Sequence, residues 1–134
     1  ICKDLEVRYS AAVHLFQSRF FSDIFPEEND HFTNLTVVDA VRNDREASLR
    51  RMRIEMLSGP FHATVFLGGM EGVHEEYQLF THLHPGALVL PVFSPGGAAQ
   101  DLAKQLGMTE DRVDFARLFS EKLGISQAEP RNQV

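Results

Sequence analysis

The most informative part of the sequence is the segment Ala63–Tyr77, which reads ATVFLGGMEGVHEEY. It begins with a short, continuous apolar run, Ala63–Leu67, which is typical of a strand buried on both faces of a sheet. Two glycines follow directly, and Val73 and Tyr77 then recur at helical spacing. A buried strand, a glycine turn and an amphipathic helix in this order indicate an α/β protein with parallel strands.

The same alternation extends along the chain in both directions. Asn43 or Asp44 can cap a helix that ends before Ser58-Gly59-Pro60. We therefore predict a Rossmann-like, three-layer α/β sandwich with a mainly parallel sheet and helices on both faces. The remaining strands are expected at Ala11–Phe16, Leu35–Val38 and Ala87–Val92, and two closing helices at Gly97–Leu106 and Glu110–Leu123.

The composition is that of one globular domain. The chain has 134 residues, of which 43% are apolar and 24% are charged. We expect residues 1–125 to form a single domain and residues 126–134 to form a tail. Ile1–Glu6 is typical of the last turns of a helix.

Charge and cysteine content exclude several classes of function. The 13 Lys and Arg residues against 19 Asp and Glu residues give a net charge of -6, which argues against partners such as nucleic acids or anionic membranes. The single cysteine, Cys2, excludes an intrachain disulfide and a multi-cysteine metal site, and the six histidines form no ligand-like cluster. We therefore expect no metal and no cofactor. No apolar run reaches the roughly 20 residues of a membrane span, and we expect a cytoplasmic location.

Two glycine turns, Gly68-Gly69 and Gly96-Gly97, each follow a predicted strand and precede a predicted helix. In open parallel sheets, ligands bind outside the carboxyl ends of the strands, and a helix N-terminus there favours an anion. Each turn alone fits a simple tight connection equally well. Neither matches the P-loop or the dinucleotide fingerprint. Together with nearby arginines they predict a phosphate-containing ligand, and the candidate binding residues at the strand ends are Ser18, Arg19, Arg45, Arg51, Gly68, Gly69, Glu71, Gly72, Glu75, Ser94, Gly96 and Gly97.

Five arginines lie between Arg42 and Arg53, on or just before one predicted helix. Arg45 is the best ligand candidate, because a guanidinium in the first turn can fork onto a phosphate. Arg51 can reach the same ligand only if its helix faces the cleft. Arg50 and Arg53 fit a solvated basic face equally well.

Three glutamates, Glu71, Glu75 and Glu76, crowd the start of the helix after Gly69. One interpretation is favourable charge at the positive end of the helix dipole. The other is a carboxylate that binds a ribose hydroxyl or acts as an acid or base.

Four stretches of the chain resemble the SLOG superfamily, which unites the Smf/DprA proteins with the LOG ("lonely guy") cytokinin-activating phosphoribohydrolases. They are Phe16–Phe21, Asp44–Arg53, Gly68–Tyr77 and Leu90–Ala99, and the likeness is greatest to the bacterial SLOG cluster 3 branch. The resemblance implies a domain that binds a nucleotide or nucleotide-derived ligand as a sensor or effector. It also implies an earlier glycine-rich loop after a first strand, and we expect both to be absent from this chain.

The LOG enzymes carry the motif Pro-Gly-Gly-x-Gly-Thr-x-x-Glu, and the chain departs from it. Leu67 replaces the proline, Val73 replaces the threonine, and one extra residue separates Gly69 from Gly72. Glu76 falls at the motif's glutamate and is the catalytic candidate if the chain is an enzyme. A LOG-like nucleoside-monophosphate phosphoribohydrolase is therefore the alternative to a binding domain, and a scaffold without ligand is a third possibility.

The resemblance also implies a homodimer, because the LOG enzymes pair and complete their sites across the interface. An apolar cluster formed by Phe20, Phe21, Ile24 and Phe25 agrees with an interface. The alternative is that these side chains pack beneath Phe32 and the neighbouring helices.

Overall fold

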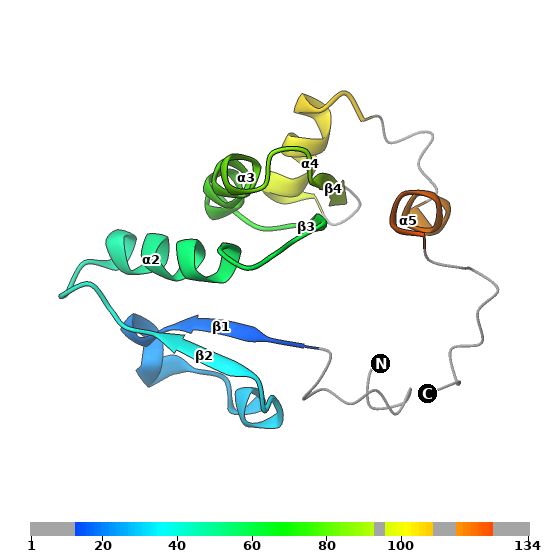
Figure 1. Ribbon diagram of the computed structural model, residues 1–134. Helices are drawn as coiled ribbons and strands as arrows, with labels where there is room; N and C mark the ends of the chain where they lie inside the picture. The colour runs from blue at the N-terminus through cyan, green and yellow to red at the C-terminus, as the bar shows by residue number, and fades with distance from the viewer. Residues whose placement is uncertain (1–12, 93–95, 109–114, 125–134) are drawn as a thin grey trace. The chain divides into compact units, whose positions relative to one another are not determined.

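The computed structural model describes residues 13–92, 96–108 and 115–124 (Figure 1). The described residues divide into two compact parts on either side of the Ser58–Gly59 link, which we call the N-terminal part and the C-terminal part. The helical turns expected at residues 1–6 and the tail expected at residues 126–134 lie outside the described residues.

The N-terminal part is built on two parallel strands, β1 (Leu15–Ser18) and β2 (Leu35–Val38), in which Ser18 lies opposite Val38. The bounds predicted for β2 are confirmed. The prediction for β1 is wrong at both ends that the structure describes. Val13 and His14 lie outside the strand, and Gln17 and Ser18 pair with the end of β2 and so continue it; residues 11 and 12 are not described. Two short 3-10 helices connect the strands, η2 (Arg19–Ile24) and η3 (Glu27–His31).

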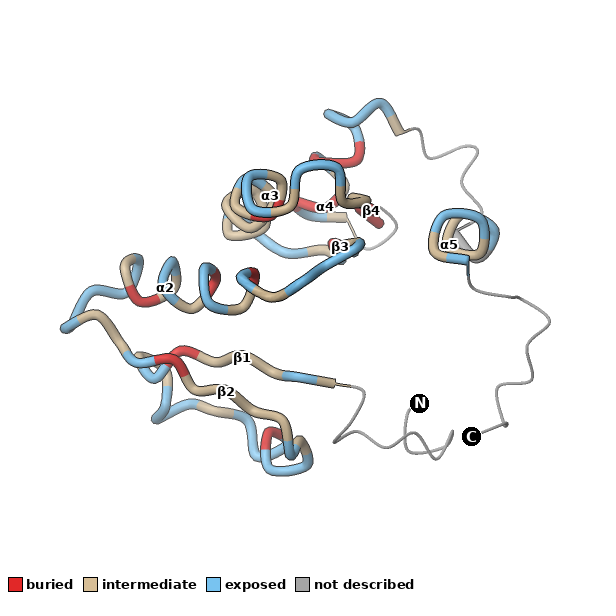
Figure 2. Tube along the Cα trace, in the orientation of Figure 1, coloured by how far each residue is buried: buried red, intermediate tan, exposed pale blue. Residues whose placement is uncertain are grey.

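Helix α2 (Arg45–Leu57) follows β2 and lies against both strands (Figure 1). Asp44 is its N-cap, as predicted, and the Asp44 carboxylate accepts a hydrogen bond from the Ala47 amide at 3.0 Å. Arg53 is only 8% exposed, and the solvated-face interpretation is therefore wrong for this arginine, whereas Arg50 is exposed. Figure 2 shows the buried positions of α2 on the side nearest the strands.

The C-terminal part contains a second parallel pair, β3 (Ala63–Leu67) and β4 (Leu88–Val92), joined by α3 (Gly72–Leu83). The prediction for β3 is confirmed at both ends, and β4 begins one residue later than expected. Helix α4 (Gly97–Gln105) follows β4 and ends one residue earlier than expected. Of the last predicted helix, the structure describes α5 (Phe115–Leu123), while residues 109–114 are not described.

One core cluster of the C-terminal part lies on the Phe66 face of the β3–β4 pair. Phe66 of β3 packs with Ala99 and Leu102 of α4, and Val73 and Tyr77 of α3 pack against this cluster. Burial of these apolar side chains holds both helices on the strands.

The opposite face of β3 differs from the expectation of a strand buried on both sides. Val65 and Leu67 are 42% and 65% exposed, whereas their partners on the same face of β4, Leu90 and Val92, are only 3% and 8% exposed. The fold class is a mixed α/β structure with parallel strands, as the sequence predicts. Within the described ranges, no helix has the length and apolar character needed to cross a membrane.

Candidate ligand-binding site

The carboxyl ends of β1 and β2 bring together several of the predicted residues. Because Ser18 lies opposite Val38, the next residues, Arg19 and Asp39, meet at the same edge. The Arg19 Nε donates a hydrogen bond to Asp39 Oδ1 at 2.8 Å, and both side chains are largely exposed to solvent.

Arg45, in the first turn of α2, belongs to the same edge. Its guanidinium carbon lies 5.9 Å from the centroid of the Phe21 ring, within the range of a cation–π contact. The same guanidinium pairs with the neighbouring Glu46 carboxylate. We call the group formed by Ser18, Arg19, Phe21, Asp39 and Arg45 the β1–β2 rim.

Ser18 has a structural partner within the rim. It is 1% exposed, and its hydroxyl oxygen accepts a hydrogen bond from the Phe20 amide at 3.4 Å, which caps η2. The sequence predicts Ser18 as a ligand-binding residue, and the structure gives its side chain an enclosed position. The exposed side chains of the rim are therefore the ones that can contact a ligand at this edge.

The turn between β2 and α2 is tied to the first turns of the helix. The Asp44 amide donates to the Val41 carbonyl at 3.0 Å, and the Val41 amide donates to Ser48 Oγ at 2.9 Å. The Ser48 hydroxyl in turn donates to the Asp44 carbonyl at 2.6 Å. Arg42, within this turn, has a φ of +52°, a conformation that the residue type does not predict.

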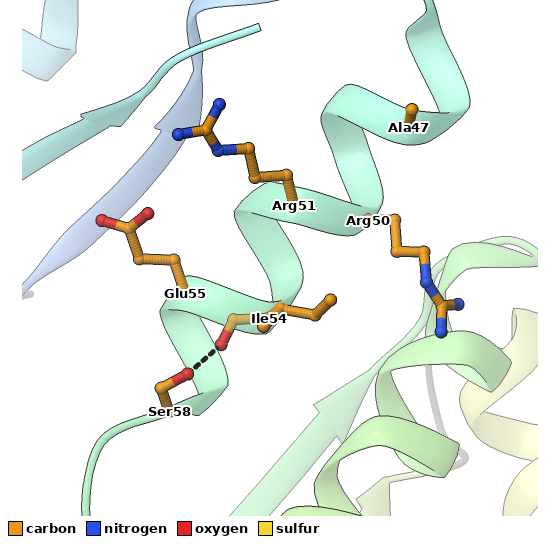
Figure 3. A pocket seen from close by; sticks show the side chains of 6 residues that line it. All are labelled: Ala47, Arg50, Arg51, Ile54, Glu55 and Ser58. Carbon is orange, nitrogen blue, oxygen red and sulfur yellow. Dashed lines mark hydrogen bonds between the residues drawn. The ribbon is translucent and has the colours of Figure 1, made fainter. Parts of the chain in front are cut away.

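Arg51 is separate from the rim. It lines a surface hollow of about 470 Å³ along α2, with Arg51 and Glu55 projecting to one side of the helix and Arg50 to the other (Figure 3). No member of the β1–β2 rim lines this hollow, and all of its lining residues come from α2 and its C-cap: Ala47, Arg50, Arg51, Ile54, Glu55 and Ser58. The structure therefore does not bring Arg51 together with Arg45.

In the C-terminal part, the two glycine turns lie directly against one another at the carboxyl ends of β3 and β4. The Ala99 amide donates to the Gly68 carbonyl at 2.9 Å, and the Ala98 amide donates to the Gly69 carbonyl at 3.0 Å. A Cβ atom at Gly97 would lie 2.5 Å from the Gly69 carbonyl oxygen. Glycine is required at position 97 because another backbone occupies the place of a side chain.

These contacts reduce the number of backbone donors that the helix ends can offer to an anion. Of the first amides of α4, those of Ala98 and Ala99 already donate to Gly68 and Gly69. At the start of α3, the Val73 and His74 amides donate to carbonyls of the preceding turn. The predicted anion sites at the two helix N-termini therefore have fewer free backbone amides than expected.

The other predicted site residues belong to the segments that follow β3 and β4 in the sequence. Glu71 is exposed at the N-cap of α3, and its side chain makes no capping hydrogen bond. Glu75 and Glu76 are half-buried in the first turns of α3, which begins at Gly72. Gly96 has a φ of +77° and a ψ of -156°, a conformation that only glycine adopts readily. Ser94 lies outside the described residues.

No group of three or more His, Cys, Asp or Glu residues in the described ranges has the arrangement of a metal site. The structure gathers guanidinium, carboxylate and aromatic groups at the carboxyl ends of β1 and β2. Separately, it brings glycine backbone together at the carboxyl ends of β3 and β4. Parallel α/β domains with polar groups at the carboxyl ends of their strands form a class of proteins that bind small ligands there.

Comparison with known families assigns the chain to one of them. The model of the SLOG cluster 3 family matches residues 1–123, and the chain belongs to this family. No curated protein and no solved structure matches the chain significantly.

Proposed function

We propose that this protein is a SLOG-type domain that binds a nucleotide or a nucleotide-derived small molecule, with a three-layer Rossmann-like architecture. The observation that carries the proposal is the β1–β2 rim, where Arg19, Asp39, Arg45 and Phe21 meet at the carboxyl ends of two parallel strands. Membership of the SLOG cluster 3 family supports it.

The rim holds one chemical group for each component of a nucleotide. A guanidinium forks onto phosphate oxygens with two parallel hydrogen bonds, and Arg19 and Arg45 both carry one. The Asp39 carboxylate accepts hydrogen bonds from hydroxyl groups such as those of ribose. The half-buried Phe21 ring is an aromatic group on which a base can stack. A ligand would replace the internal partners of the two arginines, Asp39 and Glu46, with its own anionic oxygens.

The glycine turns of the C-terminal part are a second region where a ligand can approach the backbone. Gly96 supports this role, because a Cβ atom there would meet nothing within 4 Å. Gly69 and Gly97 have packing reasons to be glycine, since added Cβ atoms would collide with Val73 and with the Gly69 carbonyl. The glycines thus support the proposal more weakly than the arginines do.

The proposal is tested by scanning fluorimetry and isothermal titration calorimetry of the full chain with AMP, ADP-ribose, cyclic ADP-ribose and NAD. We expect at least one of them to raise the melting temperature, because a ligand that binds only the folded state stabilises it. Arg45→Ala should weaken binding. Arg117→Ala is the matched control, because Arg117 is also an exposed arginine with a carboxylate partner, Glu121 at 2.7 Å in α5. No shift with any ligand at millimolar concentration would contradict the proposal.

We also propose that the protein forms a homodimer. Ile24 at the end of η2 is 74% exposed, and no residue of η2 is buried. An apolar side chain this exposed, beside the partly exposed Phe20, Phe21 and Phe25, supports an interface with a second copy.

A further inference from the structure

Arg42 occupies a backbone conformation that disfavours arginine. It is the only non-glycine residue with a positive φ in the ranges that the structure describes. Positive φ values are common for glycine and tolerated by asparagine and aspartate, because a larger side chain crowds the following carbonyl. The next residue in the chain, Asn43, would suit this position better, yet the arginine stands there.

Arg42 differs from Arg19 and Arg45 in having no ion-pair partner among the described residues. Arg19 pairs with Asp39, and Arg45 pairs with Glu46. The Asp44 carboxylate, two residues along the chain from Arg42, caps α2 through the Ala47 amide. The exposed Arg42 side chain makes no ion pair or hydrogen bond with any residue in the described part of the chain.

The turn that carries Arg42 is anchored by a buried side chain. Ser48 is fully enclosed, and its hydroxyl group accepts from the Val41 amide and donates to the Asp44 carbonyl. These two bonds fix the residues at both ends of the turn. The chain between Asp39 and Arg45 therefore cannot relax into a conformation that suits arginine better without breaking them.

We propose that Arg42 binds the phosphate of the ligand and that Ser48 positions it for this contact. The inference rests on the proposed nucleotide-binding function and adds to it a third guanidinium, beside Arg19 and Arg45. An arginine without an internal anion, held at the carboxyl end of a parallel strand pair, is suited to an external anion that accepts two hydrogen bonds. The site then selects nucleoside phosphates over the corresponding nucleosides.

The test compares the affinities of AMP, ADP-ribose and adenosine for the wild-type chain and for Arg42→Asn, by calorimetry at constant salt. Asparagine removes the charge and tolerates the positive φ, so the variant folds at least as stably as the wild type. We expect Arg42→Asn to weaken AMP and ADP-ribose at least tenfold and to leave adenosine unchanged. Arg42→Lys should recover part of the loss, and Arg117→Asn should behave as wild type.

The variant Ser48→Ala tests whether Ser48 positions Arg42 for the phosphate or only stabilises the fold. We expect it to weaken the two phosphate-containing ligands and to spare adenosine, whereas a purely structural defect would weaken all three alike. If Ser48→Ala does not fold, Arg42→Asn still decides the main point. Equal AMP affinity for wild type and Arg42→Asn overturns this inference and leaves the proposed function standing. If the wild-type chain binds neither AMP nor ADP-ribose, both this inference and the proposed function are refuted for these ligands.

Discussion

The contact between the two glycine turns makes a sharp prediction for Gly97→Ala. The new methyl group would lie 2.5 Å from the Gly69 carbonyl oxygen and 3.3 Å from the Gly68 carbonyl carbon. Both atoms belong to backbone, so no flexible side chain can move aside. The β4–α4 turn must therefore separate from the β3–α3 turn, which also strains the hydrogen bonds from Ala98 and Ala99.

The expected magnitude follows from three contributions. A residue with a Cβ atom at the φ of +67° observed for Gly97 costs roughly 1–2 kcal/mol. Overpacking of a rigid contact costs about 1–3 kcal/mol. Replacing glycine also restricts the unfolded chain, which stabilises the folded state by about 0.4–1 kcal/mol. We expect Gly97→Ala to lower the free energy of unfolding by about 3 kcal/mol, a large share of a typical stability of roughly 5–15 kcal/mol.

Gly107→Ala is the control, because Gly107 has a similar φ of +74° and a Cβ atom there would meet nothing within 4 Å. Urea unfolding of both variants should be followed by far-UV circular dichroism, since the chain has no tryptophan. Gly107→Ala isolates the backbone cost and should lower the free energy of unfolding by about 1 kcal/mol. Equal unfolding midpoints for the two variants, with equal slopes, would refute the proposed contact between the turns.

Three further predictions concern other parts of the chain. Asp44→Ala should lower the free energy of unfolding by about 1 kcal/mol in the same urea assay, because the Ala47 amide loses its cap; an unchanged midpoint would contradict the capping role. Light scattering should give the mass of a dimer for the wild type and of a monomer for Ile24→Glu, and a monomeric wild type would exclude the proposed interface. Chromatography of AMP incubated with the protein should show no release of adenine, and release that Glu76→Gln abolishes would favour the phosphoribohydrolase alternative over a binding domain.

The sequence predicts best those features that depend on neighbouring residues. The apolar runs Leu35–Val38 and Ala63–Leu67 form strands with the expected bounds. The cap at Asp44 is likewise local, because its carboxylate bonds an amide three residues along. Each of these features is set by periodicity or by a short-range hydrogen bond, and tertiary contacts do not change it.

Features that depend on distant residues could not be predicted in this way. Ser18 continues β1 because Val38 lies opposite, and Arg53 is buried because of how α2 lies in the fold. The contact of Gly97 with Gly69 joins turns that are well separated in the chain. For the candidate site, the arginines were recognisable from composition, but the unusual backbone of Arg42 depends on hydrogen bonds made by Ser48.

The crossover between β1 and β2 has a consequence for the order of folding. Parallel strands are usually joined by an α-helix that packs on them, as α3 does between β3 and β4. The β1–β2 crossover has only η2 and η3, in which Asn29 is the one buried residue. Closing that loop costs chain entropy with little burial in return. We therefore expect the folding nucleus to form around β3, α3 and β4, and the β1–β2 pair to form later.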